Sequence, residues 1–165
     1  MGSNTFIKNE NYKYINDFDA SVKYFEGAAN IAGEKFPGQE IYTVALVNLA
    51  IAWQNAGELA KCLDAFFMAL SAAENQGNQP EKSRIAHLIS YVYYLEGDYY
   101  NAEVYNSTAI NTAKLTGNGV LLQNAYQMAS LISTSLYDYE EGMKYYQRYL
   151  SIRDSLETAR GLSQQ

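Results

Sequence analysis

The sequence predicts an all-α protein built from consecutive helical hairpins. Three observations support this fold class: markers recur about every 40 residues, apolar residues follow helical spacing, and only Pro37 and Pro80 interrupt the chain. The 165 residues are 48% hydrophobic and 18% charged, which is the composition of a folded chain rather than a disordered one. A chain of this length can bury the core of one domain.

The repeat is visible at glycine positions. Gly57, Gly97 and Tyr137 occupy equivalent places and are spaced by 40 residues, and Gly77 and Gly117 keep the same spacing between the repeats. Agreement between two independent sets of markers indicates an internal repeat.

Each repeat is predicted to be helix, tight turn, helix. Residues 41–56 and 59–73 each carry apolar side chains at the i, i+3, i+4, i+7 spacing of an amphipathic helix. Glycine in the turn accepts the positive φ that ends a helix. Asp98 and Asp138 can then cap the next helix, and Glu141 completes a pattern similar to a capping box.

The residues around each turn carry a more specific pattern. An apolar residue, a small one and an aromatic precede the turn, and a small residue, usually an aromatic, and an alanine follow it. The members are Leu49, Ala50, Trp53, Ile89, Ser90 and Tyr93 before the turn, and Cys62, Ala102, Gly142, Phe66, Tyr146, Ala69 and Ala109 after it.

This pattern resembles the tetratricopeptide repeat (TPR) family, in a form with a repeat of about 40 residues rather than about 34. The resemblance implies a right-handed α-solenoid with three full hairpins and a degenerate N-terminal one. It also implies a non-catalytic module that binds proteins or peptides.

The predicted organisation follows from the repeat. Residues 1–3 resemble an expression scar, the units cover about 4–38, 39–78, 79–118 and 119–155, and residues 156–165 form a polar tail or the start of a linker. Asn106 and Ser133 stand where other units have aromatics, so we expect the third unit to pack less tightly or to bend the stack.

Five tyrosines lie in the stretch 93–105. Tyr93, Tyr99 and Tyr105 match positions that are aromatic or apolar in other units, which predicts core packing. Tyr94 and the nearby Tyr91 are predicted to lie on the surface instead.

Catalytic and cofactor motifs are absent from the sequence. His87 is the only histidine and Cys62 the only cysteine, so neither a histidine pair, a cysteine cage nor an intramolecular disulfide can form. The sequence has no G-x-S-x-G, H-E-x-x-H or G-K-[ST] motif. We therefore expect no enzyme activity, no cofactor and no metal.

Charge and hydropathy restrict the partners. The net charge of −6 disfavours nucleic acid, which requires a basic face. The longest apolar run, residues 45–53, is too short to insert into a membrane. The single cysteine favours a reducing compartment, so we expect a cytoplasmic protein, or a periplasmic one if the chain is part of a larger protein.

The resemblance also implies a binding surface. In TPR proteins the first helix of each unit lines the concave face, which here predicts the peptide-binding residues Val44, Val47, Asn48, Ile51, Arg84, His87, Tyr91, Tyr94, Asn124, Gln127 and Leu131. A carboxylate clamp for acidic chaperone tails is disfavoured, because only Arg84 supplies a cation. The predicted ligand is an amphipathic or basic peptide, unless inner-helix packing or a capping segment hides this face.

Two wider interpretations remain open. Residues 113–156 resemble the TPR arrays of bacterial sensor kinases and regulators, which implies part of a larger bacterial regulatory or signalling protein. The alternative is a structural scaffold that self-associates into a homo-oligomer through its repeat ends.

Overall fold

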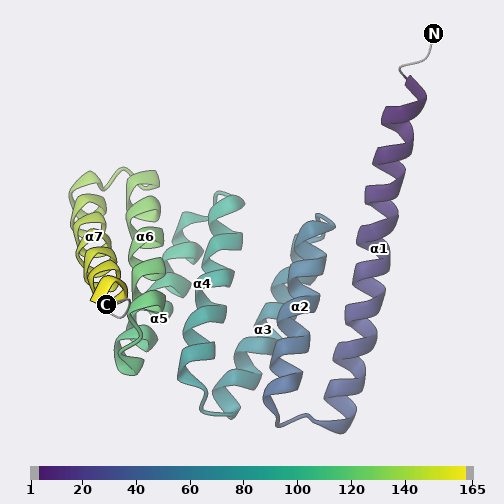
Figure 1. Cartoon of the computed structure of the whole chain (residues 1–165), viewed down its shortest axis with the longest axis horizontal. Helices are drawn as coiled ribbons and strands as arrows, with labels where there is room; N and C mark the ends of the chain where they lie inside the picture. The colour runs from purple at the N-terminus through teal and green to yellow at the C-terminus, as the bar shows by residue number, and fades with distance from the viewer. Residues whose placement is uncertain (1–3, 163–165) are drawn as a thin grey trace. The chain divides into compact units, whose positions relative to one another are not determined.

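The computed structural model describes the backbone of residues 4–162 and the side chains of residues 18–161. Within that range every regular element is an α-helix, which confirms the predicted fold class (Figure 1). The helices are α1 (Asn4–Lys35), α2 (Glu40–Asn55), α3 (Leu59–Asn75), α4 (Gln79–Leu95), α5 (Tyr99–Thr116), α6 (Gly119–Ser135) and α7 (Tyr139–Leu162).

The chain divides after Gln76 into two compact units. In unit 1, α2 pairs with α3 in a hairpin, and α1 packs against α2. The degenerate N-terminal repeat is thus a single helix of 32 residues.

Unit 2 contains the hairpins α4–α5 and α6–α7. Helix α6 packs against both α5 and α4, so consecutive hairpins share an interface. Its core includes Ala102, Met128 and Ile132, which are 0–5% exposed.

The hairpin turns share one backbone conformation. Gly57 and Gly97 both have φ of 78°, and Tyr137, at the equivalent place, has φ of 65°. Glycine adopts this left-handed conformation without strain, whereas the β-carbon of a tyrosine makes the same conformation sterically unfavourable. The predicted equivalence of the three positions is confirmed.

Two aspartates cap the helices that follow these turns. Asp98 accepts a hydrogen bond from the backbone N–H of Asn101, and Asp138 from that of Glu141, both at 3.1 Å. The N–H of Asp138 donates instead to Ser133 O at 2.9 Å. A full capping box at Asp138 is therefore not formed, because the turn already uses the N–H that Glu141 would accept.

The tyrosines of the stretch 93–105 are mostly structural. Tyr93 stacks on Tyr105 with ring centroids 5.7 Å apart, and Tyr94 lies 5.5 Å from Tyr99. Tyr93, Tyr94 and Tyr99 also pack against the core of unit 2. Core packing is confirmed for Tyr93 and Tyr99 and extends to Tyr94, which was predicted to lie on the surface, while Tyr105 stacks on Tyr93.

The contact between α5 and α6 is closely packed. Asn106 and Ser133 are 2% and 6% exposed, and Asn106 Nδ2 donates to Ala125 O at 2.9 Å. A cavity of only about 10 Å³ remains beside them. The predicted looser packing is not found at this contact, because the Asn106 amide donates a hydrogen bond to α6 directly. The alternative, a bend in the stack, stays a prediction.

Candidate functional site

The predicted binding wall begins on α2 in unit 1. Val44 and Ile51 are 42% and 37% exposed, and Asn48 is half-buried. Val47 is only 3% exposed, so its placement on an accessible wall must be corrected. It belongs to the buried core, so an acidic substitution there would place a charge among apolar side chains.

In unit 2 the wall lies on α4 and α6, which pack against each other. Tyr91 on α4 is 41% exposed and Leu131 on α6 is 45% exposed, and the two occupy equivalent repeat positions. Asn124 and Gln127 on α6 are also exposed. Two apolar side chains and two amides are therefore accessible on adjacent helices.

Arg84 is engaged within its own helix. Its Nε donates to Glu81 Oε2 at 2.9 Å, and Asn78 Oδ1 accepts from the N–H of Glu81 at 3.2 Å. The hydrogen bond to Glu81 raises the pKa of Arg84. The one cation of the predicted wall is therefore already paired with a carboxylate of its own helix.

His87 and Tyr94 are half-buried rather than open to a ligand. Burial lowers the pKa of His87, so the imidazole is neutral at pH 7. Its Nδ1 is buried and has no hydrogen-bond partner within the described part of the chain. The accessible part of the predicted wall in unit 2 thus reduces to Tyr91, Leu131 and the exposed amides.

No reactive or metal-binding group emerges from the described side chains. Cys62 is fully buried, and burial raises its pKa to about 11, which keeps the thiol protonated. Between residues 18 and 161, His, Cys, Asp and Glu do not gather in a group of three that could hold a metal.

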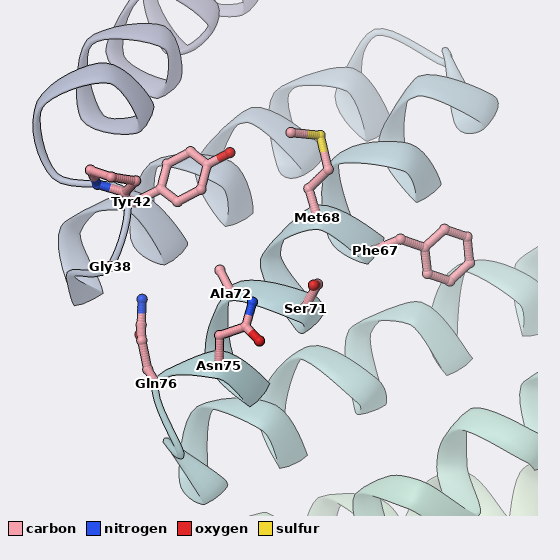
Figure 2. Close-up of a pocket in the computed structure, with 9 residues that line it drawn as sticks. Gly38, Tyr42, Phe67, Met68, Ser71, Ala72, Asn75 and Gln76 are labelled. Carbon is pink, nitrogen blue, oxygen red and sulfur yellow. The ribbon is translucent and has the colours of Figure 1, made fainter.

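A second hollow surface lies in unit 1, on the other side of α2. Three adjoining cavities of about 510, 360 and 290 Å³ share Met68 as a lining residue. Figure 2 shows the largest, where Tyr42 of α2 and Met68 of α3 come from opposite sides and Asn75 and Gln76 lie near the end of α3. We call these three cavities together the α1–α3 trough.

The floor of the trough is an apolar stripe of α2 at i, i+4, i+7, i+11 spacing. It consists of Tyr42, Leu46, Leu49 and Trp53. The predicted wall residues Val44, Asn48 and Ile51 are offset from these by two positions, about 200° around the helix. The trough and the predicted wall are therefore opposite faces of α2.

Comparison with known proteins supports the fold and not a specific function. No protein-family model matches the chain, and no curated protein sequence matches it. Among solved structures, BtubC (BKLC) from P. vanneervenii is 15% identical, with a TM-score of 0.78 over 86% of this chain and 59% of that chain. This chain therefore spans less than two thirds of the length of BtubC.

A putative kinesin light chain from Podosopora anserina, with nearly identical TPR-like repeats, is also similar. It is 11% identical, with a TM-score of 0.71 over 87% of this chain and 72% of that chain. Within the described residues, no helix combines the length and apolar character that crossing a membrane requires. The fold of the chain thus resembles that of TPR-like helical repeat proteins.

Proposed function

We propose that this TPR-like domain is a non-catalytic module that binds a segment of a partner protein on the α4–α6 surface. The ligand is an amphipathic or basic peptide. Tyr91 and Leu131 would bury its apolar side chains, and Asn124 and Gln127 would bond its backbone.

One observation carries this proposal. Two large apolar side chains, 41% and 45% exposed, occupy equivalent repeat positions on helices that pack against each other. Exposed apolar groups rimmed by amides are typical of protein interaction surfaces. The neutral His87 and the paired Arg84 leave the surface without a free cation, which favours apolar or basic ligands over acidic ones.

The test is a quantitative pull-down from lysate of the source organism, comparing wild type with a Tyr91→Ala/Leu131→Asp variant. A matched control is Tyr100→Ala/Val104→Asp, which makes the same changes at exposed positions of α5. We expect a partner that wild type and control retain and the α4–α6 variant loses. Identical capture by all three proteins, with helicity confirmed by circular dichroism, would contradict the proposal.

We further propose that the module belongs to a larger bacterial regulatory or signalling protein. The resemblance of residues 113–156 to the repeat arrays of such proteins supports this context. Sequencing the gene around this segment tests it: an adjacent effector or sensor domain is expected, and a reading frame without one would overturn it.

A second candidate function is self-association through α7. Met143 and Tyr146 are 57% and 45% exposed, whereas Asn106, the residue of α5 equivalent to Tyr146, is 2% exposed beneath α6. Sedimentation over a hundredfold range of concentration distinguishes the candidates. A mass that rises with concentration, and that Tyr146→Asp abolishes, supports self-association, whereas a constant monomer mass excludes it.

A further inference from the structure

The same repeat positions form an open surface in unit 1 and a closed one in unit 2. In unit 1, α1 and α3 both pack on α2 rather than on each other, and the α1–α3 trough lies between them. In unit 2, α5 and α7 flank α6 in the same way, but only about 10 Å³ remains open. The two regions therefore show which side chains open or close this surface.

Two side chains of α7 close the surface in unit 2. The ring of Tyr145 lies 6.0 Å from that of Tyr126, which belongs to the floor formed by α6. The guanidinium carbon of Arg148 lies 5.5 Å and 5.7 Å from these two ring centroids. An aromatic ring and a guanidinium together fill this site.

Unit 1 lacks both groups. Eighty residues earlier, the positions of Tyr145 and Arg148 hold Ala65 and Met68, and both line the trough. On the opposite side, α1 carries the exposed polar residues Glu26 and Asn30 where α5 carries the buried Asn106 and Ile110. The trough is open where α3 carries Ala65 in place of the ring of Tyr145, and where α1 carries the exposed Glu26 and Asn30 in place of two buried side chains of α5.

The charge at the trough differs from that in unit 2 as well. Glu26 of α1 and Asp64 of α3 line the same cavity, and neither has an ion-pair partner among the described residues. Their equivalents in unit 2 are Asn106 and Lys144. Lys61, the cation at this end, is 3.7 Å from Glu58 and covers the ring of Trp53 at 4.3 Å.

We propose that the α1–α3 trough is a docking site for an extended segment of a partner protein that carries an aromatic side chain close to a lysine or arginine. In unit 2 the ring of Tyr145 lies over Tyr126 of the floor. The partner's aromatic side chain would occupy the equivalent place in unit 1, over Leu46. The partner's lysine or arginine would lie between Glu26 and Asp64, much as Arg148 lies beside Tyr126 of the floor in unit 2.

The depth and length of the trough favour an extended segment over a helix. In unit 2 a single layer of side chains fills the equivalent space, so the trough has depth for side chains and not for another helix. From Asp64 to Asn75 the wall of α3 is roughly 17 Å long, which accommodates about five extended residues. The amides of Asn30 and Asn75 line the trough and can bond the backbone of such a segment.

This site is separate from the α4–α6 surface, so each can be tested without the other. The experiment is selection of a random dodecapeptide phage library on the wild-type chain, followed by fluorescence anisotropy of the enriched synthetic peptides. We expect peptides that pair an aromatic residue with lysine or arginine. Glu26→Lys/Asp64→Lys should weaken their binding by about tenfold or more, and both changes lie at exposed positions.

Two further variants sharpen the result. Glu34→Lys/Glu96→Lys makes the same change in net charge at exposed positions outside the three cavities and should leave the affinity unchanged. Ala65→Tyr restores the ring that closes unit 2 and should abolish binding. Enrichment without aromatic and basic residues overturns the proposal, as does equal binding to wild type and Glu26→Lys/Asp64→Lys. Tyr91→Ala/Leu131→Asp should bind these peptides normally, and loss of binding in that variant alone would assign them to the α4–α6 surface.

Discussion

The two units solve the same packing problem in different ways. In unit 2, Tyr145 and Arg148 of α7 lie against Tyr126 of α6, whereas in unit 1 the corresponding positions of α3 hold Ala65 and Met68 and the floor of α2 stays open. The helices pair in the same order in both regions, and the side chains at equivalent positions differ. A repeat protein can therefore keep its scaffold and create a surface by changing a few side chains at equivalent positions.

The largest expected effect comes from opening unit 2. Tyr145→Ala removes a half-buried ring between Tyr126 and Arg148 and should lower the free energy of unfolding by about 2–3 kcal/mol, below the cost for a fully buried ring. Urea titration followed by circular dichroism measures it. Tyr139→Ala, at a 63% exposed position of the same helix, should cost less than about 0.5 kcal/mol. Equal losses would show that the ring does not close this region.

A second effect concerns a serine hydroxyl that occurs at the equivalent position of both hairpins of unit 2 and is missing from unit 1. Ser90 Oγ donates to Ala102 O at 2.7 Å and Ser130 Oγ to Gly142 O at 2.8 Å, linking the two helices of each hairpin, whereas the equivalent residue of unit 1 is Ala50. Ser90→Ala should cost about 1 kcal/mol in urea unfolding, the usual value of a buried hydrogen bond. The control is Ser107→Ala at an exposed position. An equal loss of stability in that variant would show that the Ser90 hydrogen bond contributes nothing specific.

The positive φ angles in the hairpin turns predict that two substitutions change the free energy of unfolding in opposite directions. Gly97→Ala places a β-carbon at φ of 78° and should lower the free energy of unfolding by about 1 kcal/mol. Tyr137→Gly relieves the same strain at φ of 65° and should raise it by about 0.5–1 kcal/mol, because Tyr137 is 79% exposed and little packing is lost. Thermal unfolding of both variants measures the signs. A loss of stability in Tyr137→Gly would mean that the ring contributes more than the strain costs.

The smallest effect is a pH dependence of unit 2. Burial lowers the native pKa of His87 below its ordinary value of about 6.5, so the unfolded chain binds the proton more readily. His87 therefore leaves the free energy of unfolding unchanged above about pH 6.5, and it lowers that free energy as the pH falls from there towards the native pKa. The equivalent residues, Val47 and Gln127, do not titrate.

The measurement is the urea midpoint at about pH 7.5 and about pH 5.5 for wild type and His87→Gln. Carboxylates contribute equally to both proteins, so the difference between their pH slopes isolates His87. A steeper slope in wild type is expected. Parallel slopes would mean that His87 is protonated in the folded state as readily as in the unfolded one.

The sequence predicted the parts of the fold that depend on local pattern. Helical spacing of apolar residues and the 40-residue glycine period determine hairpins and turns, because both express the geometry of one helix or one turn. The position of Tyr137 was predictable for the same reason, even without a glycine. The continuous helix α1 was not, since its polar residues do not repeat the turn signal of the later units.

The surfaces were harder to predict because they depend on neighbouring helices. Val47 has the spacing of a wall residue, but it is only 3% exposed. The α1–α3 trough was missed because its signal is a difference between repeats: Ala65 against Tyr145, and Glu26 against Asn106. A comparison of repeats that scored changes in side-chain size and charge, rather than shared residues, would have found it.

The protonated, fully buried thiol of Cys62 has a practical consequence for experiments on this chain. It should react slowly with maleimides, so a cysteine introduced at an exposed position can be labelled selectively in the otherwise native sequence. A fluorophore at Ser71, beside the trough, would then report binding there, and one at Leu95, which is 54% exposed and one helical turn after Tyr91, would report binding to the α4–α6 surface. The two surfaces can thus be observed separately in solution, one dye at a time.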